Sequence, residues 1–358
     1  MPARTMVDWD LAVSAAARLA GPGPMISRPE ADAVVAELRA DAERSTGLVR
    51  EFTGLEATER SAPVLVVDRT GWIQANADGF ADVLGPLVEK LQAKRGAPNA
   101  VTEAVGSKVT ALEVGGLLGF MSSKVLGQFD PFYSGPGHDG VAPAAGRLLL
   151  VAPNIVHVES ELSVNSRDFR LWVCLHEETH RVQFTAVPWM KEHIQGEIDR
   201  LVSAVDLDPA RVAAVLGDAV KRIGDVVRGE EEVSLLDLFS TAEQRVVMDR
   251  LTGVMSLLEG HADVVMDGVG PQVIPSVDDI RRKFNQRRKG AGYLDRVLRR
   301  LLGLDAKMAQ YRDGAAFVRA VVDAVGMDGF NAVWAGPENL PSKAEIGDPA
   351  AWVRRVHG

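Results

Sequence analysis

The hydrophobic pattern of this 358-residue chain is mostly that of α-helices, with few segments that favour β-strands. Two short apolar runs, residues 63–68 and 147–151, are each expected to form a short buried strand. Apolar residues recur at helical spacing over residues 72–91 and 105–126, and over nearly all of the chain after Pro153. We therefore predict a mainly α-helical fold with a small β component.

Capping residues indicate where three of the later helices begin or end. Ser166 is a suitable N-cap for one helix, and Pro188 suits the first position of the next helix. Residues 240–243, Ser-Thr-Ala-Glu, form a capping box that opens a long helix. That helix is expected to end at Gly268 or Gly270.

The domain organisation is predicted from the loops. Residues 134–146 are rich in Gly, Pro and Ala and form the clearest loop of the sequence. This loop is too short to establish two domains, so we expect one domain over residues 1–358. Within it, residues 1–60 are an N-terminal helical part that could form a separate subregion, and residues 147–358 are a helical core.

Composition and charge exclude several classes of protein. The chain is 46% hydrophobic and 25% charged, the balance of a soluble protein with a sizeable core. Its net charge of −9 argues against nucleic acid as the main partner. The apolar runs are all shorter than the ~18 residues that a membrane-spanning helix needs. A single cysteine excludes an internal disulfide framework, so a cytoplasmic location is expected.

The strongest chemical signal is residues 176–180, His-Glu-Glu-Thr-His, an H-E-x-x-H motif within the helical core. Two histidines four positions apart share one face of a helix, so both imidazoles can bind a single Zn²⁺. Glu177 then lies beside the open position of the metal, where it can take a proton from a bound water as general base. His176 and His180 are therefore the predicted zinc ligands. Glu177 is the predicted catalytic base.

A catalytic zinc site needs a third protein ligand, for which we prefer Glu259. Glu259 shares a helix face with Asp263 beside an apolar seam, where two carboxylates are costly unless a cation compensates them. Asp263 would accept the free N–H of a zinc-bound histidine. This E-x-x-x-D is similar to the gluzincin arrangement of thermolysin-like peptidases, although 78 residues lie between His180 and Glu259.

Two histidines remain as alternative third ligands. His261 projects about 200° away from Glu259 around the helix, and His193 lies beyond Pro188 on the next helix. The longer metzincin pattern is excluded, because Gln183 and Ala186 stand where it requires glycine and histidine.

The chain also resembles a known family, the actinobacterial zincin-like metallopeptidases of type 2. Members are described as hydrolases or as associated with deazaflavin cofactor biosynthesis. The resemblance implies a zincin-like architecture built around the HEETH helix, without implying a substrate. The segments that carry it are residues 125–132, 148–159, 168–189, 255–267 and 310–314, and the stretch from 330 to 352.

The predicted function is that of a zinc-dependent metallohydrolase, in the first place a metallopeptidase that acts on a peptide. Tyr311 is the candidate donor to the oxyanion that develops during hydrolysis. One alternative is a hydrolase of a small amide or ester metabolite, and the other is a zincin-shaped binding or scaffold protein without turnover. The oligomeric state is left open by the sequence.

Overall fold

The chain divides into two compact units in the computed structural model. The first comprises residues 1–188 and 265–284, and the second comprises residues 189–264 and 285–358. The long helix α10 (Ala242–Val269) runs without a break from one unit into the other. The structure describes residues 7–56, 63–95, 100–133, 135, 146–203, 242–289 and 304–358.

The first unit contains a small sheet, the helices around it and the end of α10. Its helices are α1 (Trp9–Leu19), α2 (Arg28–Thr53), α3 (Arg69–Arg95), α4 (Ala100–Ser122), α5 (Ala152–Leu162), α6 (Ser166–Ala186) and most of α11 (Val277–Lys289). Its strands are β1 (Val64–Val67), β2 (Gly127–Asp130) and β3 (Arg147–Val151).

The sheet is mixed and has the strand order β1-β3-β2. Strand β3 is parallel to β1, with Val64 opposite Leu148, and antiparallel to β2, with Gly127 opposite Leu150. All five residues of β3 are buried, as the run of apolar residues in a central strand requires. An ion pair between Asp130 and Arg147, at 3.0 Å, joins residues that face each other across the β2–β3 pair.

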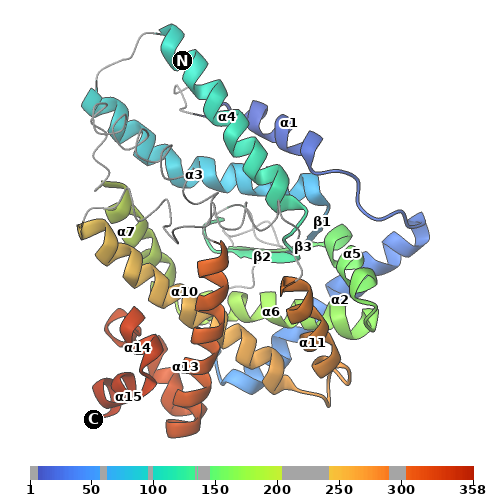
Figure 1. Ribbon diagram of the computed structural model, residues 1–358, viewed down its shortest axis with the longest axis vertical. Helices are drawn as coiled ribbons and strands as arrows, with labels where there is room; N and C mark the ends of the chain where they lie inside the picture. Colours follow the sequence, from blue (N-terminus) through green and yellow to red (C-terminus); the bar gives the residue numbers. More distant parts are fainter. Residues whose placement is uncertain are drawn as a thin grey trace. The chain divides into compact units, whose positions relative to one another are not determined.

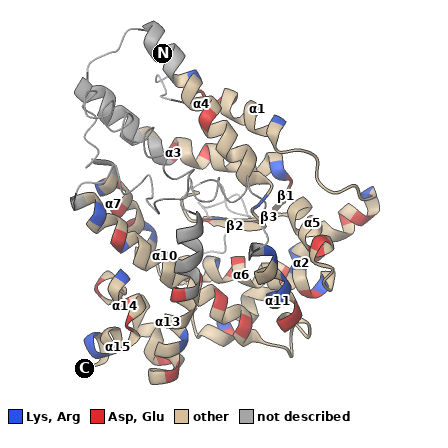
Figure 2. Ribbon diagram, viewed as in Figure 1, with Lys and Arg blue, Asp and Glu red and all other residues tan. Residues whose placement is uncertain are grey.

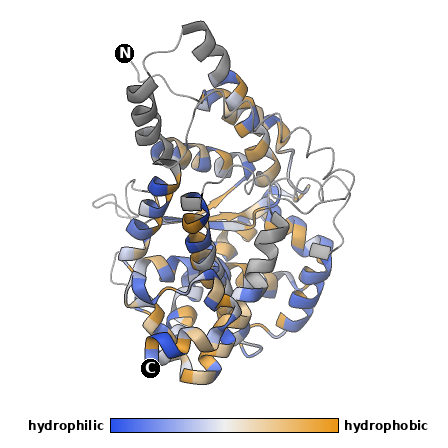
Figure 3. Ribbon diagram, turned by 60° about the vertical axis from the view of Figure 1, so that its left-hand side comes forward, coloured by the Kyte–Doolittle hydropathy of each residue, from blue (hydrophilic) through white to orange (hydrophobic). Residues whose placement is uncertain are grey.

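Helices cover both faces of this sheet. Helices α1, α3 and α4 lie on one side of it, and α2, α5 and α6 lie on the other (Figure 1). The side chains of β2 alternate between these layers, because Gln128 accepts a hydrogen bond from Trp72 of α3 while Phe129 packs against Phe184 of α6. Strands β1 and β3 consist mostly of valine and leucine and are among the most hydrophobic parts of this unit, whereas β2 is mostly polar (Figure 3).

The second unit is helical in its described part. It contains α7 (Trp189–Ser203), most of α10, α13 (Leu304–Phe330), α14 (Lys343–Gly347) and α15 (Pro349–His357), with short 3₁₀ turns at Asn331–Trp334 and Pro337–Asn339. Its core includes Phe317 and Trp352, both fully buried and packed edge to face at a centroid distance of 5.8 Å.

Most sequence-based expectations agree with these elements. The mainly helical class with a small β component is confirmed, and α10 ends at Val269, before Gly270, whose φ is +82°. The N-cap of α6 is Asn165, whose side chain accepts a hydrogen bond from the backbone N–H of Asp168. The expectation of Ser166 as this cap was therefore wrong by one residue.

Other expectations concern parts outside the described residues. These are the capping box at 240–243, of which Ser240 and Thr241 are not described, and most of the loop at 134–146. Strand β2 was not expected, since residues 127–130 lack a continuous apolar run. None of the described helices is both long enough and apolar enough to cross a membrane.

Candidate metal centre

Helix α6 carries the H-E-x-x-H motif and is built as a mostly buried helix. Phe169, Leu175 and Cys174 are fully buried, and burial raises the pKa of the Cys174 thiol well above its ordinary value. The helix packs against β2 and β3 on one side and against α2 on another. The motif is thus held in the middle of the first unit and is not on a solvated surface helix.

The two histidines of the motif point at one place. His176 Nε2 and His180 Nε2 lie 3.3 Å apart, and their rings are nearly perpendicular, at 87°. Two nitrogens bound to one tetrahedral zinc ion at 2.0–2.1 Å are separated by about 3.3 Å. The pair therefore fits a shared zinc ion without rearrangement, and both side chains are only half-buried, which leaves the position accessible.

Each histidine has a partner at its other ring nitrogen. His180 Nδ1 lies 3.0 Å from Oε1 of Gln183, a side chain that is completely buried. His176 Nδ1 lies 3.1 Å from Sδ of Met266, at the end of α10 that belongs to the first unit. In the sequence, Gln183 stands out only as a departure from the metzincin pattern. The signal that could have found it is its spacing of three residues from His180.

Glu177 lies against the backbone of strand β2. Its side chain is 6% exposed, and a Cβ added to Gly127 would be 2.5 Å from Glu177 Cγ and 2.9 Å from Oε1. Only glycine at position 127 leaves this space to the glutamate. The predicted general base, Glu177, thus packs between its own helix and Gly127, the first residue of β2.

The neighbouring carboxylate, Glu178, has a structural role. It is fully buried, and its Oε1 accepts hydrogen bonds from Thr46 Oγ1 of α2 at 2.7 Å and from Arg181 Nη2 at 2.6 Å. Burial raises the pKa of Glu178, while the Arg181 guanidinium opposes that change. These contacts fix the rotation of α6 against α2, and hence the direction in which both histidines point.

Helix α10 supplies the other predicted ligand. Glu259 is buried, at 9% exposed, and Asp263 is half-buried one turn later. Among the described residues, His176, His180 and Glu259 are the group that could hold a metal ion, since one ligand atom from each lies within 4.8 Å of the others. Two imidazole nitrogens and one carboxylate oxygen form a donor set that zinc binds in hydrolases, so these residues fit the metal.

The two alternative third ligands, His261 and His193, each lie against aromatic rings. His261 is fully buried in the second unit, where its ring lies 5.4 Å from the ring of Phe330 and 5.4 Å from that of Trp334. His193 lies edge-on to Trp189, and burial lowers its pKa. Tyr311 belongs to α13, but its side chain is outside the described residues.

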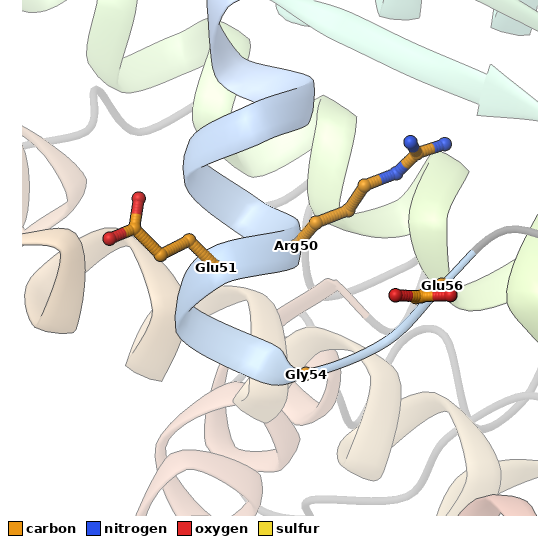
Figure 4. A pocket seen from close by; sticks show the side chains of 4 residues that line it. All are labelled: Arg50, Glu51, Gly54 and Glu56. Atoms are coloured by element: carbon orange, nitrogen blue, oxygen red, sulfur yellow. The ribbon is translucent and has the colours of Figure 1, made fainter.

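A surface hollow at the end of α2 does not share this chemistry. Arg50, Glu51, Gly54 and Glu56 line it, and the side chains of Arg50 and Glu51 point to opposite sides of the helix (Figure 4). Helix α2 carries both basic and acidic residues along its length (Figure 2). The hollow therefore offers no convergent group for a ligand.

Comparisons with known proteins find a matching family and a similar solved structure. The family described as zincin-like metallopeptidase matches residues 7–353. A crystal structure of a candidate hydrolase with a novel fold, from Chloroflexus aurantiacus, is 32% identical to this chain. The match covers 98% of both chains with a TM-score of 0.69. A comparison with curated proteins returned no match.

Proposed function

Because the chain belongs to the zincin-like metallopeptidase family, we propose that it is a zinc-dependent hydrolase that cleaves amide bonds in peptides. The observation that carries the proposal is the grouping of His176, His180 and Glu259, with Glu177 directly after His176 on the same helix. A purely structural metal site would not need a carboxylate at position 177.

In this proposal His176, His180 and Glu259 hold the zinc ion. When bound, zinc supplies Lewis acidity, which polarises the scissile carbonyl and lowers the pKa of water. The half-buried state of both histidines supports access of a substrate to the ion. Asp263, on the same face of α10 as Glu259, is proposed to orient a ligand histidine.

Glu177 performs the proton transfers of the reaction. Its carboxylate takes a proton from the water as the water oxygen attacks the amide carbon. The same carboxyl group then gives that proton to the amide nitrogen, and the carbon–nitrogen bond breaks to release the amine and the acid. The contact of Glu177 with Gly127 supports this role, because it limits the positions that the carboxylate can take.

A peptide is preferred to a small metabolite as the substrate because of strand β2. In the strand order β1-β3-β2, strand β2 is the edge strand of the sheet, and its first residue, Gly127, contacts Glu177. An extended peptide that pairs with such an edge would bring its backbone amide groups next to the general base. Tyr311 remains the proposed donor to the developing oxyanion.

The first experiment is metal analysis of the purified protein by mass spectrometry, with His176→Ala and Glu259→Ala variants. We expect about one zinc ion per chain in the wild type and strongly reduced zinc in both variants. The wild type should then be tested on a mixture of peptides, with cleavage products identified by mass. A zinc-loaded protein that cleaves small amides but no peptide would contradict the peptidase proposal and leave the hydrolase proposal standing.

A further inference from the structure

We propose that Gln183 is a positioning residue that sets the tautomer of His180 for metal binding. The inference rests on the proposed zinc site and adds a residue to it. Gln183 is completely buried and stands one turn after His180 on α6. Its Oε1 lies 3.0 Å from His180 Nδ1, within hydrogen-bond distance.

The chemistry of the two groups determines the direction of this bond. An amide oxygen can only accept, so Nδ1 of His180 must carry the proton and donate it. A neutral imidazole has one N–H, and with that proton on Nδ1 the Nε2 atom keeps its lone pair. Nε2 is the atom that faces His176 Nε2 at 3.3 Å, so the lone pair points to the place where the metal would be bound.

The local structure makes this arrangement rigid. Positions i and i+3 lie on one helical face, so the bond closes within a single helix and needs no other element. The neighbouring residue Val182 is 2% exposed, and Phe184 packs on Phe129 of β2 at a centroid distance of 5.6 Å. A buried side chain held in this way loses little entropy when it orients the histidine, which is what an outer partner of a metal ligand requires.

The test compares Gln183→Met with Gln183→Glu. Methionine has a similar volume but only a weak acceptor, whereas glutamate keeps a strong acceptor at the same reach. Zinc affinity, measured by competition with a chromogenic chelator, should fall about 10–100-fold in Gln183→Met and return to within about threefold of the wild type in Gln183→Glu.

The second readout is the tautomer itself, measured on metal-free protein by long-range ¹H–¹⁵N correlation spectra of labelled histidines. We expect His180 to carry its proton on Nδ1 in the wild type and in Gln183→Glu, and to lose this preference in Gln183→Met. The matched control is Ser45→Ala, which removes another buried hydrogen bond, from Ser45 Oγ to the Asp41 carbonyl at 2.7 Å in α2. It should leave both zinc affinity and tautomer unchanged.

The possible failures are distinguishable. Wild-type protein that binds zinc, together with a Gln183→Met variant of unchanged affinity and unchanged tautomer, overturns the role of Gln183 and leaves the proposed function intact. Wild-type protein that binds no zinc overturns the proposed function, and the tautomer spectra then decide by themselves whether Gln183 controls His180. An equal loss of affinity in Ser45→Ala would reduce Gln183 to a structural residue.

Discussion

Glu177 and Glu178 are neighbours in the sequence with different surroundings. Glu178 is tied to Thr46 and Arg181 by short hydrogen bonds, so its carboxylate is used to hold α6 in place. Glu177 instead packs against the backbone of Gly127, the first residue of β2. A single position along a helix thus separates a group that serves stability from one that can serve chemistry.

Replacement of the proposed base should affect turnover and spare the metal. In Glu177→Gln the ligands are unchanged, so zinc content should remain at the wild-type level, while kcat falls roughly 10²-fold or more through loss of the base. The rate is measured on the best peptide substrate with metal-replete protein. Glu178→Gln is the matched control, expected to lower stability more than catalysis. A Glu177→Gln protein with near-normal turnover would show that another group moves the proton.

Three substitutions in α10 test the choice of the third ligand. Glu259→Ala should lose zinc almost completely, and Asp263→Ala should weaken zinc affinity by ~10–100-fold. His261→Ala should keep zinc but lower the free energy of unfolding by roughly 2–4 kcal/mol, because it empties a buried position between two aromatic rings. Loss of zinc from a folded His261→Ala protein, with zinc retained in Glu259→Ala, would reverse the assignment.

At the scale of elements, the contact between β2 and α6 depends on one glycine. A methyl group at position 127 would meet Glu177 Cγ at 2.5 Å, so Gly127→Ala should displace this side chain. We expect a fall in kcat of about 10-fold or more with unchanged zinc stoichiometry, measured on the same substrate. Gly47→Ala is the control, since its Cβ meets nothing within 4 Å in α2, and it should be neutral or stabilise by up to about 1 kcal/mol. Equal activities of the two variants would refute the packing argument.

Helix α2 carries a pH-dependent element of stability at Asp41. Burial, with the nearby Glu37 carboxylate, raises the pKa of Asp41 to about 6, against the opposing effect of Arg44, Arg167 and Arg170. Below pH ~4 the group is protonated in both the folded and the unfolded chain. Between pH ~4 and ~6 the unfolded chain releases this proton first, so stability falls as the pH rises.

The variant Asp41→Asn removes that loss. Its free energy of unfolding should match the wild type near pH 4 and exceed it at pH 7 by on the order of 2 kcal/mol. Urea unfolding at a series of pH values measures the difference. A stability difference that does not change between pH 4 and pH 7 would mean that Asp41 titrates normally in the folded protein.

Some elements were predictable from the sequence, and others were not, for physical reasons. Strands β1 and β3 and helix α6 have continuous apolar runs or helical repeats, so they could be placed from the sequence. Strand β2 begins with glycine and alternates between two layers over four residues, which is too short a pattern to distinguish from a loop. The role proposed for Gln183 depends on which face of α6 is buried, and that face is set by packing against α2 and β2.

For the whole molecule, zinc should contribute to folding stability because α6 and α10 both supply proposed ligands. A ligand bound only by the native state at 1,000 times its Kd adds ~4 kcal/mol. Removal of zinc with a chelator should therefore lower the Tm by roughly 5–10 °C, and added zinc should restore it. Calorimetry measures the shift, with Glu259→Ala as a control that should not respond. An unchanged Tm in the wild type would argue against a tightly bound ion.

The position of β3 in the sheet has a consequence for the order of folding. Val64 of β1 pairs with Leu148 of β3, a separation of 84 residues, and β3 lies between two strands that precede it in the chain. During synthesis β1 and β2 therefore emerge before the strand that joins them, and closing so long a loop is slow. Helix α6 follows β3 after one short helix. The H-E-x-x-H motif is therefore synthesised shortly after the last strand of the sheet. A nascent chain cannot assemble the proposed metal site early, and the unpaired strands β1 and β2 are the segments that a chaperone would need to protect.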